Sequence, residues 1–124
     1  MNHAQNAYVA QSVSTASPAR LLVMLLDRLV LDVQRAISAQ ESGDHLAASP
    51  DLMHAQEIVL ELKTSLRLDV WEGAAQLSSI YDWLYRELIR ANVNRDVAVT
   101  RDCLGIIEPL VGTWREAALA SVAS

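Results

Sequence analysis

Metal chemistry in a helical chain requires histidines and carboxylates at fixed spacings, and this sequence offers few of them. A di-iron site in a helical bundle needs Glu-x-x-His on two helices and two further inward carboxylates. The nearest match is the stretch Asp51-Leu-Met-His54, which has Asp in place of Glu and no second copy. His3, His45 and His54 share no spacing that is typical of zinc ligands. We therefore expect no metal site and no cofactor.

Nucleophilic chemistry has one candidate side chain, the single cysteine Cys103. It cannot form an internal disulfide, which fits a reducing compartment. The sequence places no activating partner beside it, so we expect a small core hydrophobe. Glu57 and Glu61 are interpreted as a solvated helix face rather than as catalytic carboxylates. No glycine-rich phosphate loop or nucleophile elbow is present, and the pattern does not favour an enzyme.

The composition of the 124 residues is that of one globular domain, 1–124, with 52% hydrophobic and 20% charged residues. Four glycines and three prolines supply too few turns for an all-β fold. The net charge is −5 with one lysine, Lys63, which argues against nucleic-acid binding. No secretory signal and no apolar stretch of about 20 residues is present, so a cytoplasmic protein is expected.

The chain opens with a polar leader, residues 1–16, that carries two apolar anchors, Tyr8 and Val13. An isolated helix this short is marginal in water. Ser17 and Pro18 then form a helix start, because Ser accepts bonds from free amides and Pro fits the first helical turn. We expect the leader to be a short helical or mobile cap segment in front of a helical domain.

Apolar residues recur at spacings of three and four in four segments, which predicts four amphipathic helices. The predicted segments are 18–40, a second that is regular over 50–66, 73–92 and a fourth beginning near Asp96. The start of the second helix is ambiguous, because Pro50 lies six residues past Asp44. Gly43 is expected to take a left-handed conformation at the first turn. Pro109 should kink the fourth helix without ending it, and residues 118–124 should fray. Short links between the helices make the expected fold all-α, an antiparallel four-helix bundle.

The aromatic residues of the third predicted helix cannot all face one core. Residues two apart lie about 200° apart on a helix, so Trp83 points to a different face from Tyr81 and Tyr85. One interpretation is that some of them are simply half-exposed. The other is an apolar groove for a partner helix.

The stretch TASPARLLVMLLD, residues 15–27, resembles the N-terminal signature of the flagellar secretion chaperones, the FliS family. Further matches follow in the same order along nearly the whole chain: Ala7-Tyr8, Val13, Gly43-Asp44, Ile80-Tyr81-Asp82, Arg90-Ala91-Asn92, Ile107–Leu110 and Trp114. The chain departs from the family at Arg28 and Gly112, where glycine and arginine are common. It also has Gly73-Ala74 in place of Gly-Gly. Arg28 puts the local helix packing in question.

The resemblance implies a four-helix chaperone that captures the C-terminal segment of flagellin and delivers it to the export gate protein FlhA. It implies no nucleotide and no metal, and a monomer or weak homodimer. Tyr8 and Val13 would cap the cargo site or contact the gate. Six apolar residues are candidates for flagellin contact, although each could belong to the core: Leu62, Leu66, Ile80, Tyr81, Leu84 and Ile107.

Two other functions stay open on composition alone. The first is a helical scaffold or oligomerising bundle with no export role. The second is a small helical enzyme, which would need a polar cluster that the sequence does not reveal. Binding of flagellin would separate the chaperone from both.

Overall fold

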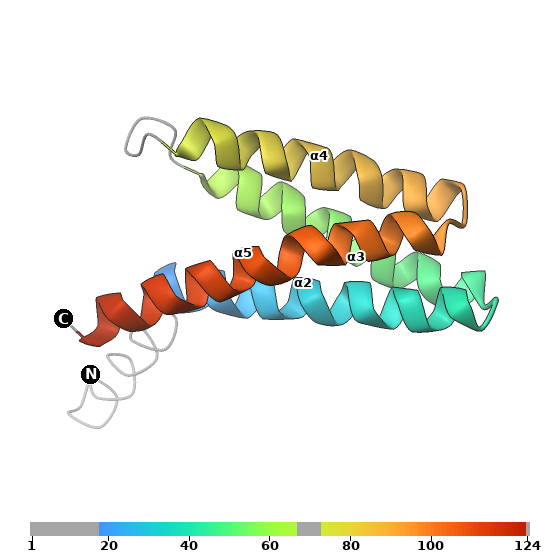
Figure 1. Cartoon of the computed structure of the whole chain (residues 1–124), viewed down its shortest axis with the longest axis horizontal. Coiled ribbons are helices and arrows are strands. Elements are labelled where there is room, and N and C mark those ends of the chain that lie inside the picture. The colour runs from blue at the N-terminus through green and yellow to red at the C-terminus, as the bar shows by residue number, and fades with distance from the viewer. Residues whose placement is uncertain (1–17, 67–72, 124) are drawn as a thin grey trace, which may run out of the picture.

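Four long helices make up the computed structural model, which describes residues 18–66 and 73–123. They are α2 (Pro18–Glu41), α3 (His45–Ser65), α4 (Ala74–Val93) and α5 (Val97–Ala123). Each helix runs opposite to the one before it, as Figure 1 shows. Over the described ranges the fold is therefore the expected all-α, antiparallel four-helix bundle, with no strand.

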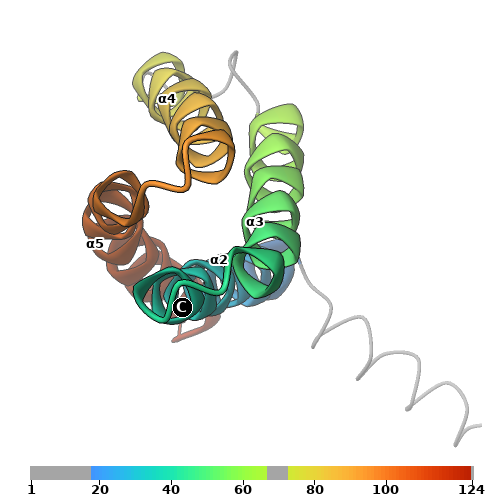
Figure 2. The ribbon, with the colours of Figure 1, turned by 90° about the vertical axis from the view of Figure 1, so that its right-hand side faces the viewer.

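The helices form a closed ring in which each one touches its two neighbours (Figure 2). Helix α2 packs against α3 and α5, and α4 completes the ring between them. The contact between α4 and α5 is the least extensive of the four. The core consists mainly of aliphatic side chains, the largest of which are Leu26, Leu29, Leu52, Leu84, Leu88, Ile107 and one aromatic residue, Tyr81.

The first turn confirms the role expected of Gly43, whose φ of 73° lies in the left-handed region. The start of the second helix, ambiguous in the sequence, lies at His45, five residues before Pro50. The carboxylate of Asp44 accepts a hydrogen bond from the Ala47 amide at 3.1 Å, and this cap starts α3 at His45. Pro50 therefore lies inside the helix, on its exposed side, where the missing N–H costs one backbone bond.

On α4 the sequence pattern predicts one apolar line made of Leu77, Ile80, Leu84, Leu88 and Ala91, and all of these except Ile80 are buried. Ile80 was placed on this line with Tyr81 beside it, but Tyr81 is 2% exposed and Ile80 is 37% exposed. Neighbouring residues point about 100° apart, so only one of the two can face the core. The larger tyrosine ring fills that position, and Ile80 turns to the surface.

Helix α5 begins as expected after Asp96, whose carboxylate accepts hydrogen bonds from Ala98 and Val99. It continues through Pro109 without a break. The expected fraying from residue 118 is wrong for the backbone, because the helix extends to Ala123. The predicted connection over residues 68–72 lies outside the described residues, as does the leader.

Candidate functional site

An apolar groove opens between α4 and α5, where the bundle is least tightly packed. We call it the α4/α5 groove and define it by Ser79, Ile80 and Trp83 of α4 and Ile106 of α5. Its volume is about 270 Å³. Ile80 and Ile106 are 37% and 42% exposed, so two branched aliphatic side chains face solvent on its walls. Such a surface can bind the apolar side of a peptide segment.

Tyr81 lies behind this groove and fixes the position of its α4 wall. Burial raises the pKa of its hydroxyl to about 12, because the phenolate would lose its hydration. A side-chain hydrogen bond with Trp114 of α5 lowers this pKa, but by less than burial raises it. The tyrosine thereby links α4 to α5 and leaves Ile80 and Trp83 on the flank of α4.

The six residues predicted to contact flagellin occupy different environments. Leu62, Tyr81, Leu84 and Ile107 are buried within one core cluster, and Leu66 packs against that cluster while partly exposed. Ile80 alone among the six lines the α4/α5 groove. The other two predicted site residues, Tyr8 and Val13, lie outside the described residues.

Sequence reasoning overlooked Ile106, and it considered Trp83 only as one of three aromatic residues that are either half-exposed or part of an apolar groove. The buried positions of α5 include Val99, Cys103, Ile107 and Val111, and Ile106 lies about 100° from Ile107. The sequence signal that could have indicated Ile106 as a surface contact is a large aliphatic residue that lies next to Gly105 and beside the line of buried residues.

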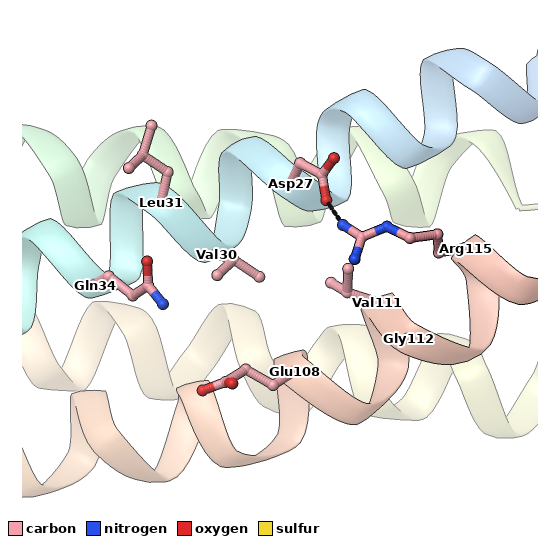
Figure 3. A pocket seen from close by; sticks show the side chains of 8 residues that line it. All are labelled: Asp27, Val30, Leu31, Gln34, Glu108, Val111, Gly112 and Arg115. Carbon is pink, nitrogen blue, oxygen red and sulfur yellow. Dashed lines mark hydrogen bonds and ion pairs between the residues drawn. The ribbon is translucent and has the colours of Figure 1, made fainter.

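A second, more polar hollow lies between α2 and α5 (Figure 3). Its volume is about 430 Å³, and Val30 and Val111 contribute its apolar surface. Asp27 of α2 and Arg115 of α5 point toward each other and form an ion pair. This α2/α5 pocket is also lined by Leu31, Gln34, Glu108 and Gly112.

Of Gly112 and Arg28, two positions at which the chain departs from the family, Gly112 faces this side of the bundle. A methyl group added at Gly112 would meet no atom within 4 Å. Packing against the described part of the chain therefore does not require a glycine here.

The other departure, Arg28, belongs to a polar contact that crosses from α2 to α3. Asp32 of α2 is fully buried, and its carboxylate accepts a hydrogen bond from Arg28 Nε at 3.0 Å. The second oxygen of that carboxylate bonds to Nδ1 of His54 on α3. The side chain of Arg28 is half-exposed, so its ion pair with the buried Asp32 lies at the edge of the α2–α3 contact.

The remaining chemical groups offer little for catalysis. Burial raises the pKa of the Cys103 thiol to about 12, and the negative charges of Glu87 and Asp102 add to the effect. A protonated, buried thiol is a poor nucleophile. Within the described ranges, no three His, Cys, Asp or Glu side chains are grouped as metal ligands would be. None of the helices described is long and apolar enough to cross a membrane.

Comparison with known proteins gives one consistent result. The family model "Flagellar protein FliS" matches residues 1–121. A protein of Bacillus subtilis (strain 168), "Flagellar secretion chaperone FliS", is 31% identical over 111 residues, covering 90% of this chain and 83% of its own. The proteins of the same name from Salmonella typhimurium (strain LT2) and Vibrio cholerae are 31% and 24% identical. They match over 110 and 107 residues, which cover 87% and 86% of this chain and 82% and 79% of theirs.

Proposed function

The chain belongs to the FliS family of flagellar secretion chaperones, and on this premise we propose that its cargo is the C-terminal segment of flagellin, bound at the α4/α5 groove. The observation that carries the proposal is the family match over residues 1–121. FliS is a family of chaperones and not of enzymes. Binding takes place in the cytoplasm, prevents premature polymerisation, and precedes delivery to the export gate protein FlhA.

The groove suits such a cargo because its exposed surface is almost wholly apolar. A segment that is unfolded when free can fold as it binds, burying its own apolar stripe against Ile80, Trp83 and Ile106. Full burial of an exposed isoleucine is worth about 1.5–3 kcal/mol. Ile80 and Ile106 are partly covered already, so each should contribute about 1 kcal/mol.

Of the six candidate contact residues, we propose a direct role for Ile80 and a supporting role for the other five. Tyr81, Leu84 and Ile107 pack in the core behind the groove, and Leu62 and Leu66 extend that core along α3. By packing in the core, these five residues fix the distance between α4 and α5, and so the shape of the groove that the cargo segment binds. Contact of the cargo with Leu62, Tyr81, Leu84 or Ile107 would require the bundle to open, because these four side chains are buried.

The test is calorimetric titration of the full chain with the flagellin C-terminal segment. Ile80→Ser and Ile106→Ser should each weaken binding about five- to tenfold, which corresponds to about 1–1.4 kcal/mol. Val93→Ser is the matched control, because Val93 is 73% exposed on α4 and lies outside the groove. Co-purification with flagellin, and with flagellin lacking its C-terminal segment, identifies the cargo region.

Two results would count against the proposal. If Val93→Ser and Ile80→Ser weaken binding of the flagellin segment equally, the groove is not part of the binding site. Capture of flagellin lacking its C-terminal segment would show that another part of the cargo binds. A Leu84→Ala variant should instead lose about 2–5 kcal/mol of folding stability while its folded fraction keeps its affinity.

A further inference from the structure

The outer face of α3 carries a row of large apolar side chains that neither the α4/α5 groove nor the α2/α5 pocket includes. Leu46, Met53 and Leu60 follow one another at intervals of seven and are 86%, 54% and 45% exposed. Seven residues are almost two full turns, so the row drifts by only about 20° per interval. The buried residues Ala55 and Val59 lie on the opposite side of the helix.

Two carboxylates stand in or beside this row. Glu57 lies between Met53 and Leu60 on the same face, one turn from each, and Glu61 follows Glu57 by four residues. Both are exposed, and neither makes an ion pair or side-chain hydrogen bond in the described part of the chain. Like charges four residues apart repel each other along a helix.

The bases of α3 do not neutralise these acids. Lys63 forms an ion pair with Asp82 of α4, and His54 is bonded to Asp32. The outer face is thus an apolar row with an unpaired negative edge. Such a surface is complementary to apolar and cationic side chains together.

We propose that this face docks an amphipathic helix of a second protein, with apolar side chains at heptad spacing and Lys or Arg along one flank. Heptad spacing favours a helix lying nearly parallel to α3, over the about 21 Å from Leu46 to Leu60. A second copy of the chain fits poorly, because its α3 contains no arginine and its one lysine, Lys63, is already paired with Asp82. An anionic membrane surface would be repelled by Glu57 and Glu61.

The α3 face and the α4/α5 groove lie on different parts of the ring, and both can be occupied at once. Helix α3 packs between α2 and α4, whereas the groove lies between α4 and α5 (Figure 2). Occupation of the groove by the cargo therefore leaves the α3 face available to the docking helix. This inference does not depend on which segment of flagellin binds in the groove.

The experiment measures binding of the full chain to two synthetic amphipathic helical peptides by fluorescence anisotropy. Both peptides carry leucines at heptad spacing, and they differ in having Lys or Glu along one flank. The Lys peptide should bind about tenfold more tightly than the Glu peptide at low salt, and the difference should shrink as salt rises.

Variants of the full chain identify the surface. Met53→Ser with Leu60→Ser should weaken binding of the Lys peptide about fivefold or more, and Glu57→Gln with Glu61→Gln should remove most of its salt dependence. The matched controls are Val93→Ser and Asp102→Asn, exposed residues of α4 and α5, which should leave binding unchanged. Circular dichroism melting confirms that each variant is folded. Saturation with the flagellin segment should not alter the affinity of the Lys peptide.

Several outcomes would overturn the proposal. Each of three results would show that a cationic amphipathic helix does not dock on this face. They are equal binding of the two peptides, no binding of either, and equal losses of affinity in the control variants. A dimer that dissociates on Met53→Ser would make the face a contact between copies of the chain. Binding that appears only after deletion of residues 1–14 would make the leader its occupant, and competition by flagellin would assign the face to the cargo.

Discussion

Single residues show how this bundle accommodates charge in its interior. Asp32 is fully buried, yet its two carboxylate oxygens are met by Arg28 of the same helix and His54 of the next. Both partners reach the surface, so the charge is compensated at the edge of the core and not within it. A buried carboxylate without such partners would cost several kcal/mol.

Two titratable side chains in the core predict a loss of stability in alkali. Burial raises the pKa of Cys103 from 9.0 to about 12, and that of Tyr81 from 10.0 to about 12. Above pH 9 the unfolded thiol therefore loses its proton while the folded thiol keeps it. The unfolded state then binds fewer protons, and the free energy of unfolding falls as pH rises, by about 1.4 kcal/mol per pH unit for each group.

Urea denaturation at a series of pH values measures this effect. The decline should begin near pH 9 and steepen near pH 10, when Tyr81 joins Cys103. In Cys103→Ala the decline should begin only near pH 10, whatever the variant's stability at neutral pH. If wild type and Cys103→Ala decline in parallel between pH 9 and 10, the thiol is not the group responsible.

At the scale of the helices, the sequence was most informative where a local rule determines the structure. Pro18, Gly43 and Asp96 mark boundaries through backbone preference and capping, and the helices follow them closely. Pro50 made the start of α3 ambiguous in the sequence, because proline is common at helix starts, whereas the Asp44 cap begins the helix at His45.

The candidate site was harder to predict than the fold, because it depends on small rotations of packed helices. The same apolar pattern on α4 allows either Ile80 or Tyr81 to face the core. The choice depends on Trp114, 33 positions further along the chain, to which Tyr81 is hydrogen-bonded. Periodicity within one helix contains no such information, and Ile106 was overlooked for the same reason.

Two glycine positions should respond to alanine in opposite ways. Gly112 lies inside α5 with open space around it, so Gly112→Ala should raise the free energy of unfolding by about 0.5–1 kcal/mol. Gly43 has a φ of 73°, and Gly43→Ala should lower that free energy by about 1–2 kcal/mol. Urea denaturation followed by circular dichroism checks both variants. A destabilised Gly112→Ala would mean that something packs against this position in solution.

At the scale of the whole molecule, the closed ring of helices predicts a fold that is stabilised by its own hydrophobic core. The four apolar stripes meet in one cluster, in which each helix is represented. We therefore expect a monomer or weak homodimer by light scattering. Helicity measured by circular dichroism should be unchanged by excess EDTA, since apolar packing supplies the stability. A large loss of helix on chelation would overturn the metal-free prediction.

The leader, residues 1–16, allows a test of whether the chain's own N-terminal segment occupies the α4/α5 groove until cargo displaces it. Tyr8 and Val13 are apolar anchors in a polar stretch too short to hold a helix alone. An apolar groove left open invites aggregation, so we propose that the leader covers part of the α4/α5 groove until flagellin displaces it. Deletion of residues 1–14 should then leave the affinity for flagellin unchanged or increase it, and should lower solubility.

Hydrogen exchange of residues 4–14, with and without the flagellin segment, distinguishes this cap from a leader that contacts cargo or the export gate. A displaced cap loses its docking partner, so its amides should exchange faster once flagellin is bound. A leader that contacts the cargo gains protection, and its amides should slow. Slower exchange would therefore eliminate the displaced cap. Tyr8→Ser supplies the matched variant: in the free chain it should quicken exchange of the leader as flagellin does, because the anchor is lost without any change in the groove.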